Sequence, residues 1–293
     1  MADTVSEART MRDSGRTLDE ILTHLRGEGL SVIDSIKVVI ETHGLSLRQA
    51  KALVHGSPAW ADRKDEHDAS HDDLIRAATA ETGTVDVLAA LAAIYDDITE
   101  HVSRLGPAEL LRPSRCAGWT VGDVLYHQLL DARRALVTFA SPAAGRPDVD
   151  EVTYWQGFAP GDDDSAAHAR HVRIVASAYS DGMLGREWRE TAAAAVRAAR
   201  DCPHDLLTTQ GHVLRTDDFV STLVFEATVH HLDMTDEPPA RDALRVVRRV
   251  LDGLLGDTGP DWDDRTYALK ATGREPLTDD ERAAYGARFP LTG

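Results

Sequence analysis

Two residues spaced four apart could bind one metal ion from a single helix. Glu226 and His230 lie in the segment FVSTLVFEATVHHLDM. Side chains four residues apart lie one turn apart on the same face of an α-helix, so both can reach one ion. The spacing alone has little specificity, and the pair by itself is equally compatible with an ion pair on a helix surface. The same acid-x-x-x-His spacing recurs at Glu20/His24, Asp97/His101, Asp123/His127 and Asp164/His168.

The residues around Glu226 favour the metal interpretation. Phe219, Leu223, Glu226, His230 and Asp233 follow the three-or-four-residue stepping of one helix face. That face begins with apolar residues, so we expect it to point into a protein core. A carboxylate is costly to bury unless a cation compensates its charge, and a metal ion would do so. His231 is expected to point away from this face.

His127 is the candidate for a third ligand. It lies in VGDVLYHQLLDARRAL, where it shares a helix face with Val124 and Asp131. On its own, His127 would be interpreted as an ordinary core or surface histidine. Ligands from two facing helices converge readily in the core of a helical bundle. We therefore predict a metal site formed by one residue of this helix and two of the later one.

The predicted ligand set is His127, Glu226 and His230. Three protein ligands leave one coordination position open, which is typical of catalytic sites. Two imidazoles and a carboxylate suit Zn²⁺, and they also accept Fe²⁺, Ni²⁺ or Mn²⁺. Asp131 and Asp233 are candidates for carboxylates that orient the histidine rings.

Other metal-capable or reactive residues are given a lesser role. His67 and His71 also have metal-capable spacing, but their surroundings are polar and mixed in charge, so we interpret any binding there as incidental. The two cysteines, Cys116 and Cys202, form no CxxC pair. We expect both to lie inert at helix ends or in the core.

The residues that carry these ligands belong to four predicted helices, and the sequence predicts a mostly α-helical fold built around a four-helix bundle. Apolar residues recur at helical spacing, and Thr120 followed by Asp123 predicts a capped helix start. We expect an interruption of the third helix at Gly182 or Gly185. The predicted helices span about 85–105, 121–141, 163–201 and 217–235.

Further segments flank this bundle. We predict a small helical unit, a polar linker, the bundle, and a C-terminal extension with an amphipathic helix and a short strand near Tyr267–Ala271. In the N-terminal unit, Thr17 and Glu20 have capping-box spacing. The predicted boundaries are 1–62 for the unit, 63–83 for the linker, 84–239 for the bundle and 240–293 for the extension.

Composition narrows the classes of partner. The chain has 293 residues, 42% of them hydrophobic, and a formal net charge of −17. Such a charge repels phosphate backbones and anionic lipid, so we expect no nucleic-acid or membrane partner. The N-terminal sequence lacks a basic stretch followed by an apolar one, and no segment is long and apolar enough to cross a membrane. We expect a cytoplasmic protein.

Three segments of this chain resemble the DinB-like superfamily, in particular its mycothiol-dependent maleylpyruvate isomerase branch. CAGWTVGDVLYHQLLD is similar to the second-helix signature that precedes a metal-binding histidine, here His127. FEATVHHLDM is similar to the fourth-helix signature, where Glu226 and His230 would complete the site. The tail ATGREPLTDDERAAYGARFPL is similar to the C-terminal extension of actinobacterial members, and the resemblance covers roughly 84–290.

The resemblance implies a thiol cofactor, mycothiol, and a small electrophilic substrate. A thiol coordinated by a divalent cation loses its proton and becomes nucleophilic near neutral pH. The same site would serve a cis-trans isomerase or an S-transferase, so the sequence leaves both open. Arg274 could bind a substrate carboxylate, although a structural role is the preferred interpretation.

Two alternatives to a thiol-dependent enzyme stay open at this stage. One is a metal-dependent hydrolase that uses a metal-bound water. The other is a non-catalytic metal-binding bundle whose N-terminal unit docks on a protein partner. Residues 14–60 resemble the C-terminal domain of the bacterial ribosomal stalk protein in the stretch IKVVIETHGLSLRQAKALV. We interpret this unit as a helical hairpin used for docking rather than as a ribosomal component.

Overall fold

The chain forms two compact units, described here separately. A computed structural model describes residues 2–43, 50, 53–54, 57–63, 85–157, 163–180 and 182–292. The smaller unit spans Met1–Thr84 and the larger one Val85–Gly293. Each unit has a hydrophobic core of its own. Most of the predicted linker, including His67 and His71, lies outside the described residues.

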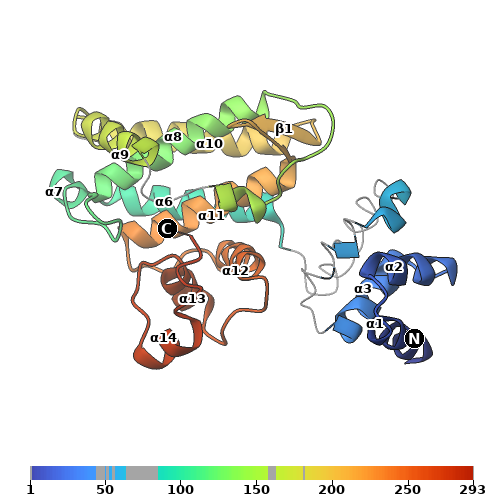
Figure 1. The fold of residues 1–293 in the computed structure, drawn as a ribbon. Helices are drawn as coiled ribbons and strands as arrows, with labels where there is room; N and C mark the ends of the chain where they lie inside the picture. Colours follow the sequence, from blue (N-terminus) through green and yellow to red (C-terminus); the bar gives the residue numbers. More distant parts are fainter. Residues whose placement is uncertain are drawn as a thin grey trace. The chain divides into compact units, whose positions relative to one another are not determined.

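The larger unit is built on four long helices: α6 (Val87–Ser103), α8 (Val121–Phe139), α10 (Met183–Asp201) and α11 (Thr216–Met234). α8 packs along α10 and α11 packs along α6, and contacts of α10 with α6 and of α11 with α8 close the bundle. Figure 1 shows α8 and α10 as one layer over α6 and α11. The predicted mostly α-helical fold, built around a four-helix bundle, is therefore confirmed.

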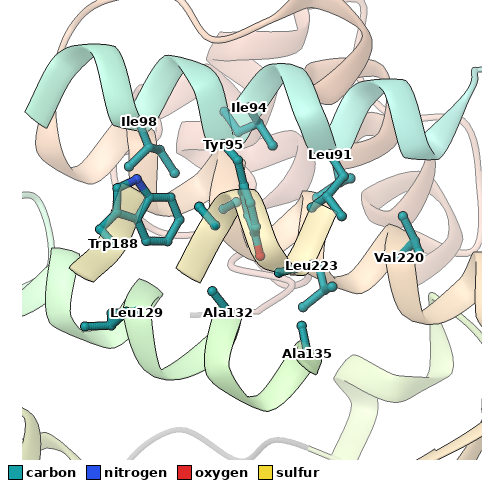
Figure 2. Packing of buried hydrophobic residues seen from close by; sticks show 14 of the residues in the cluster. Leu91, Ile94, Tyr95, Ile98, Leu129, Ala132, Ala135, Trp188, Val220 and Leu223 are labelled. Carbon is teal, nitrogen blue, oxygen red and sulfur yellow. The ribbon is translucent and has the colours of Figure 1, made fainter. Parts of the chain in front are cut away.

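Aliphatic and aromatic side chains of all four helices meet in the middle of the bundle (Figure 2). Trp188 of α10 is fully buried, and its ring meets that of Tyr95 edge to face, with centroids 5.1 Å apart. The Trp188 indole donates a hydrogen bond to Thr99 Oγ1 at 2.9 Å. This bond satisfies the one polar atom that the large side chain brings into the core.

The start of α8 follows from its sequence. The Thr120 hydroxyl accepts a hydrogen bond from the backbone of Asp123, and the Asp123 carboxylate accepts one from the backbone of Thr120. This reciprocal pair satisfies two amide groups that have no partner within the helix. The predicted capping box is therefore present, and it begins the helix that carries His127.

The predicted third helix is interrupted, as expected. It forms α9 (Asp163–Ala176) and α10, and Gly182 caps α10 with a left-handed φ of 70°. Glycine adopts this conformation at little steric cost, so the break occurs there rather than at Gly185 within α10. α9 packs against α8.

A small hairpin that the sequence analysis did not predict precedes α11. β1 (Leu206–Thr209) pairs antiparallel with β2 (His212–Arg215). The two-residue turn is Gln210–Gly211, with positive φ values of 48° and 83°. A residue pair ending in glycine between two β-prone runs was the available sequence signal.

The C-terminal extension is helical, with α12 (Arg241–Leu255), α13 (Asp264–Ala271) and α14 (Asp279–Tyr285). α12 packs on α11, α6 and α13. The short strand expected near Tyr267–Ala271 was wrong, since these residues belong to α13. Asp263 caps that helix by accepting a hydrogen bond from Thr266, and the helix buries Tyr267 and Leu269 together.

The smaller unit contains α1 (Ala2–Asp13), α2 (Leu18–Gly27), α3 (Val32–His43) and the 3₁₀ helix η1 (Pro58–Arg63). The capping box predicted at Thr17 and Glu20 begins α2. α1, which the sequence analysis did not single out, packs against α2 and α3. Ala50, Leu53 and Val54 are also described and helical, and the other residues of 44–56 lie outside the described part.

None of the helices among the described residues combines the length and the apolarity that crossing a bilayer requires.

Candidate metal centre

The loop before α8 is tied to the end of α11. Its backbone closes on itself through a hydrogen bond from Ser114 N to Trp119 O at 2.9 Å. Arg115 then donates from its backbone to Asp233 O at 3.0 Å and from its guanidinium to Thr235 O at 3.1 Å. These bonds bring α8 and α11 into register at the point where their polar side chains meet.

The three residues predicted as ligands, the triad of His127, Glu226 and His230, converge. His127 Nε2 lies 2.8 Å and His230 Nε2 lies 3.4 Å from Glu226 Oε1. One ligand atom from each residue lies within 4.8 Å of the other two. Bonds of about 2.0–2.1 Å in a tetrahedral site place ligand atoms roughly 3.3 Å apart. The donor types and their spacing therefore fit a divalent ion, and the two close contacts also suit charge-assisted hydrogen bonds without one.

Burial and charge govern the protonation of Glu226. Burial by itself would raise the pKa of this carboxyl group. Hydrogen bonds from His127 and His230 outweigh that effect and hold the pKa well below its usual value. Burial would likewise lower the pKa of His230, yet hydrogen bonds to Asp233, Cys116 and Glu226 raise it well above its usual value. Glu226 is therefore an ionised carboxylate with two imidazoles directed at it.

Asp233 orients His230. Its Oδ2 lies 2.8 Å from His230 Nδ1, which leaves Nε2 directed at Glu226. Arg274 from the C-terminal extension contacts both carboxylate oxygens of Asp233 at 3.2 Å. Burial alone would raise the pKa of Asp233, but these partners lower it to about 2. The structural role preferred for Arg274 agrees with this ion pair.

Asp131 pairs with an arginine and not with the histidine ring that the sequence had suggested. It forms an ion pair with Arg134, three residues on, at 3.2 Å. Burial, followed by the nearby charge of Glu226, raises the pKa of Asp131. Among the described contacts, Asp233 and not Asp131 is the carboxylate that orients a histidine ring. His231 points away from the triad, as expected, toward Glu237 O at 3.2 Å.

His168 of α9 is a neighbour that sequence reasoning missed. Its Nε2 lies 3.2 Å from Nδ1 of His127, and the two rings meet edge to face with centroids 5.3 Å apart. Burial, followed by the charge of His127, lowers the pKa of His168, which favours its neutral form. The Asp164/His168 spacing gave no signal above the other pairs of that kind.

Cys116 also lies closer to the candidate ligands than the sequence indicated. Both cysteines are free and partly buried, but Cys116 lies beside the triad, with Sγ 3.5 Å from Asp233 Oδ2. Cys116, His230 and Asp233 form a second group with metal-capable spacing. The Arg274 guanidinium already contacts Sγ at 3.8 Å and pairs with Asp233, and its positive charge opposes a cation there. The first group is therefore the better metal site.

The triad lies in the wall of a cavity of about 600 Å³. Cavities of this size, with apolar walls and few polar groups, are typical of small-molecule sites. Trp119 and Trp155 contribute aromatic surface, and the C-terminal extension adds Thr272, Arg274 and Thr292 to the wall. The fold and this site thus define a helical bundle with a candidate metal centre open to a small ligand.

Comparison with known families assigns this bundle. Residues 91–235 match the family model of the mycothiol maleylpyruvate isomerase N-terminal domain. This part of the chain, which includes His127, Glu226 and His230, belongs to that DinB-like family. No curated protein gives a significant match, and no solved structure does.

Proposed function

We propose that this protein is a metalloenzyme of the maleylpyruvate isomerase type that activates a small thiol for reaction with an electrophilic substrate. The observation that carries the proposal is the convergence of His127, Glu226 and His230 on the wall of a ligand-sized cavity. The family description supplies the candidate thiol, mycothiol.

The three side chains would hold a divalent ion, with Zn²⁺ expected and Fe²⁺, Ni²⁺ or Mn²⁺ as alternatives. A divalent cation at this position would lower the pKa of a coordinated thiol, so that the thiolate is available near neutral pH. Three protein ligands leave a position for that thiol. An isomerase and an S-transferase both need this activated thiolate, and the proposal covers either reaction.

The protein's own contribution is orientation and exclusion of water. Asp233 fixes the His230 ring, and its pairing with Arg274 holds the carboxylate in that orientation. Trp119 packs edge to face on His127, with ring centroids 5.5 Å apart. Aromatic surface beside the ligands limits access of bulk water, which strengthens electrostatic interactions at the site.

The test is thiol dependence of turnover. Zn²⁺-loaded protein would be assayed with maleylpyruvate for isomerisation and with a panel of haloalkyl and epoxide electrophiles for S-transfer, each with and without mycothiol. We expect turnover that requires the thiol and falls at least about 100-fold in His127→Ala and Glu226→Ala, because these remove ligands of the activating ion.

Two controls make the result interpretable. Glu187→Gln changes a carboxylate on α10 that is paired with Arg133, and it should leave turnover unchanged. Circular dichroism would verify that each variant is folded. Turnover of ester or amide substrates without thiol would instead favour the hydrolase, and a metal-loaded protein inert toward every substrate would favour a non-catalytic bundle.

A further inference from the structure

The two histidines of the candidate metal centre have unlike partners at their second ring nitrogens. His230 Nδ1 faces the buried carboxylate of Asp233 at 2.8 Å. His127 Nδ1 faces the imidazole of His168 at 3.2 Å. The Nε2 atoms of both rings face Glu226 Oε1. The site therefore has one histidine oriented by a carboxylate and one oriented by another histidine.

A metal-bound histidine needs a partner for the nitrogen that does not bind the ion. When Nε2 binds a metal, Nδ1 must carry the proton, and an acceptor for that proton fixes the tautomer and the ring orientation. A neutral imidazole has one nitrogen with a free lone pair, so it can accept this hydrogen bond. His168 Nε2 lies within hydrogen-bond distance of His127 Nδ1.

We propose that His168 is a positioning residue for the metal centre: its Nε2 accepts a hydrogen bond from the Nδ1–H of His127, and this bond presents His127 Nε2 to the ion. This inference rests on the proposed function, since it assigns a partner to one of the ligands proposed there. α9 then does more than cover α8, because it supplies a side chain that sets the geometry of the site.

The location of His168 separates this role from a purely structural one. Its side chain lies outside the hydrophobic core and is only partly covered by the protein, so truncation leaves no void in the core. Alanine is also the best helix former, so the substitution should not weaken α9. Loss of a partner of this kind weakens metal affinity by about 10–100-fold, and a neutral acceptor belongs at the lower end of that range.

The experiment measures Zn²⁺ affinity of the full chain by competition with a chromogenic chelator, together with the visible spectrum of the Co²⁺-substituted protein. We expect His168→Ala to weaken Zn²⁺ binding about 10-fold and to change the Co²⁺ spectrum. His168→Gln should restore affinity to within about threefold, because the amide oxygen can replace Nε2 as acceptor. His171→Ala, on the same helix and also exposed, should match the wild type.

Thermal melting of the metal-free proteins would show that all variants are folded alike. Wild-type affinity and spectrum in His168→Ala would overturn this inference and leave the proposed function standing. An equal loss in His168→Gln and His168→Ala would also overturn it, because the hydrogen-bond acceptor would not be what matters. If the wild-type protein bound no metal, the proposed function would fail and this inference with it.

Discussion

Asp233 Oδ2 lies 2.8 Å from Nδ1 of His230, and the same carboxylate is held by the guanidinium of Arg274. One fully buried acid thus links a candidate metal ligand on α11 to the C-terminal extension. The extension lies outside the segment that matches the family, yet it determines how that ligand is held.

Asp233→Asn should weaken both the metal centre and the fold. The asparagine amide carries no charge to compensate His230 or the partly buried guanidinium of Arg274. We therefore expect metal affinity to fall about 10–100-fold and the free energy of unfolding to fall by about 3 kcal/mol. Metal titration and urea unfolding of the metal-free protein would measure the two effects. Asp236→Asn, an exposed neighbour paired with Arg115, is the control and should change neither. Unchanged values in Asp233→Asn would rule out the linking role.

His101 should make the fold sensitive to mild acid. It lies almost fully buried on α6, and this burial lowers its pKa. Glu237 opposes the shift, whereas the positive charges of Arg104 and Arg112 lower the pKa further. The ring of His231 lies beside it, with centroids 6.3 Å apart. Because the folded-state pKa is below the unfolded value of about 6.5, stability is complete above that pH and is lost as the pH falls below it.

The variant His101→Leu tests this pH dependence, because it removes the titrating ring. Between pH 7.5 and pH 5, the wild-type free energy of unfolding should fall more than that of the variant, because the unfolded chain binds a proton at His101 more readily than the folded one. Urea unfolding of metal-free protein at both pH values measures this difference. His171→Leu replaces an exposed histidine and serves as the control. An identical pH response in His101→Leu and the wild type would exclude His101 as the source.

Trp188 should be a major source of bundle stability. Trp188→Ala removes the side chain that contacts Tyr95 and Thr99 in the core, and we expect a loss of about 3–5 kcal/mol in the free energy of unfolding. Val137→Ala, at an exposed position of α8, is the matched control and should cost less than about 0.5 kcal/mol. Denaturant unfolding followed by circular dichroism measures both. A cost below about 1 kcal/mol for Trp188→Ala would mean that the bundle core repacks around the loss.

The sequence predicted the parts of the site that depend on helical periodicity. Glu226 and His230 share a face because of their spacing, and His127 lies on an apolar face of its own helix. Both faces turn inward, since their apolar neighbours drive burial. The start of α8 was predictable because the Thr120 capping box is local. The assignment of all three residues as metal ligands is still a prediction.

The parts that escaped prediction depend on tertiary contacts. His168 and Cys116 reach the site through the packing of α9 and through a loop anchored to α11, and no local pattern marks either of them. Asp131 appeared equivalent to Asp233 in the sequence, but Arg134 on the next turn pairs with it instead. α13 was misread as a strand because its helix is short, and its capping by Asp263 was overlooked.

The metal content of the purified protein tests the proposed site of His127, Glu226 and His230 most directly. It would be measured by elemental analysis for the wild type beside Glu226→Ala and Glu187→Gln. We expect about one divalent ion per chain in the wild type and in Glu187→Gln, and a loss of that ion in Glu226→Ala, because the three ligands form one site. Absence of metal from the wild type after incubation with Zn²⁺ or Fe²⁺, or equal metal in Glu226→Ala, would contradict it.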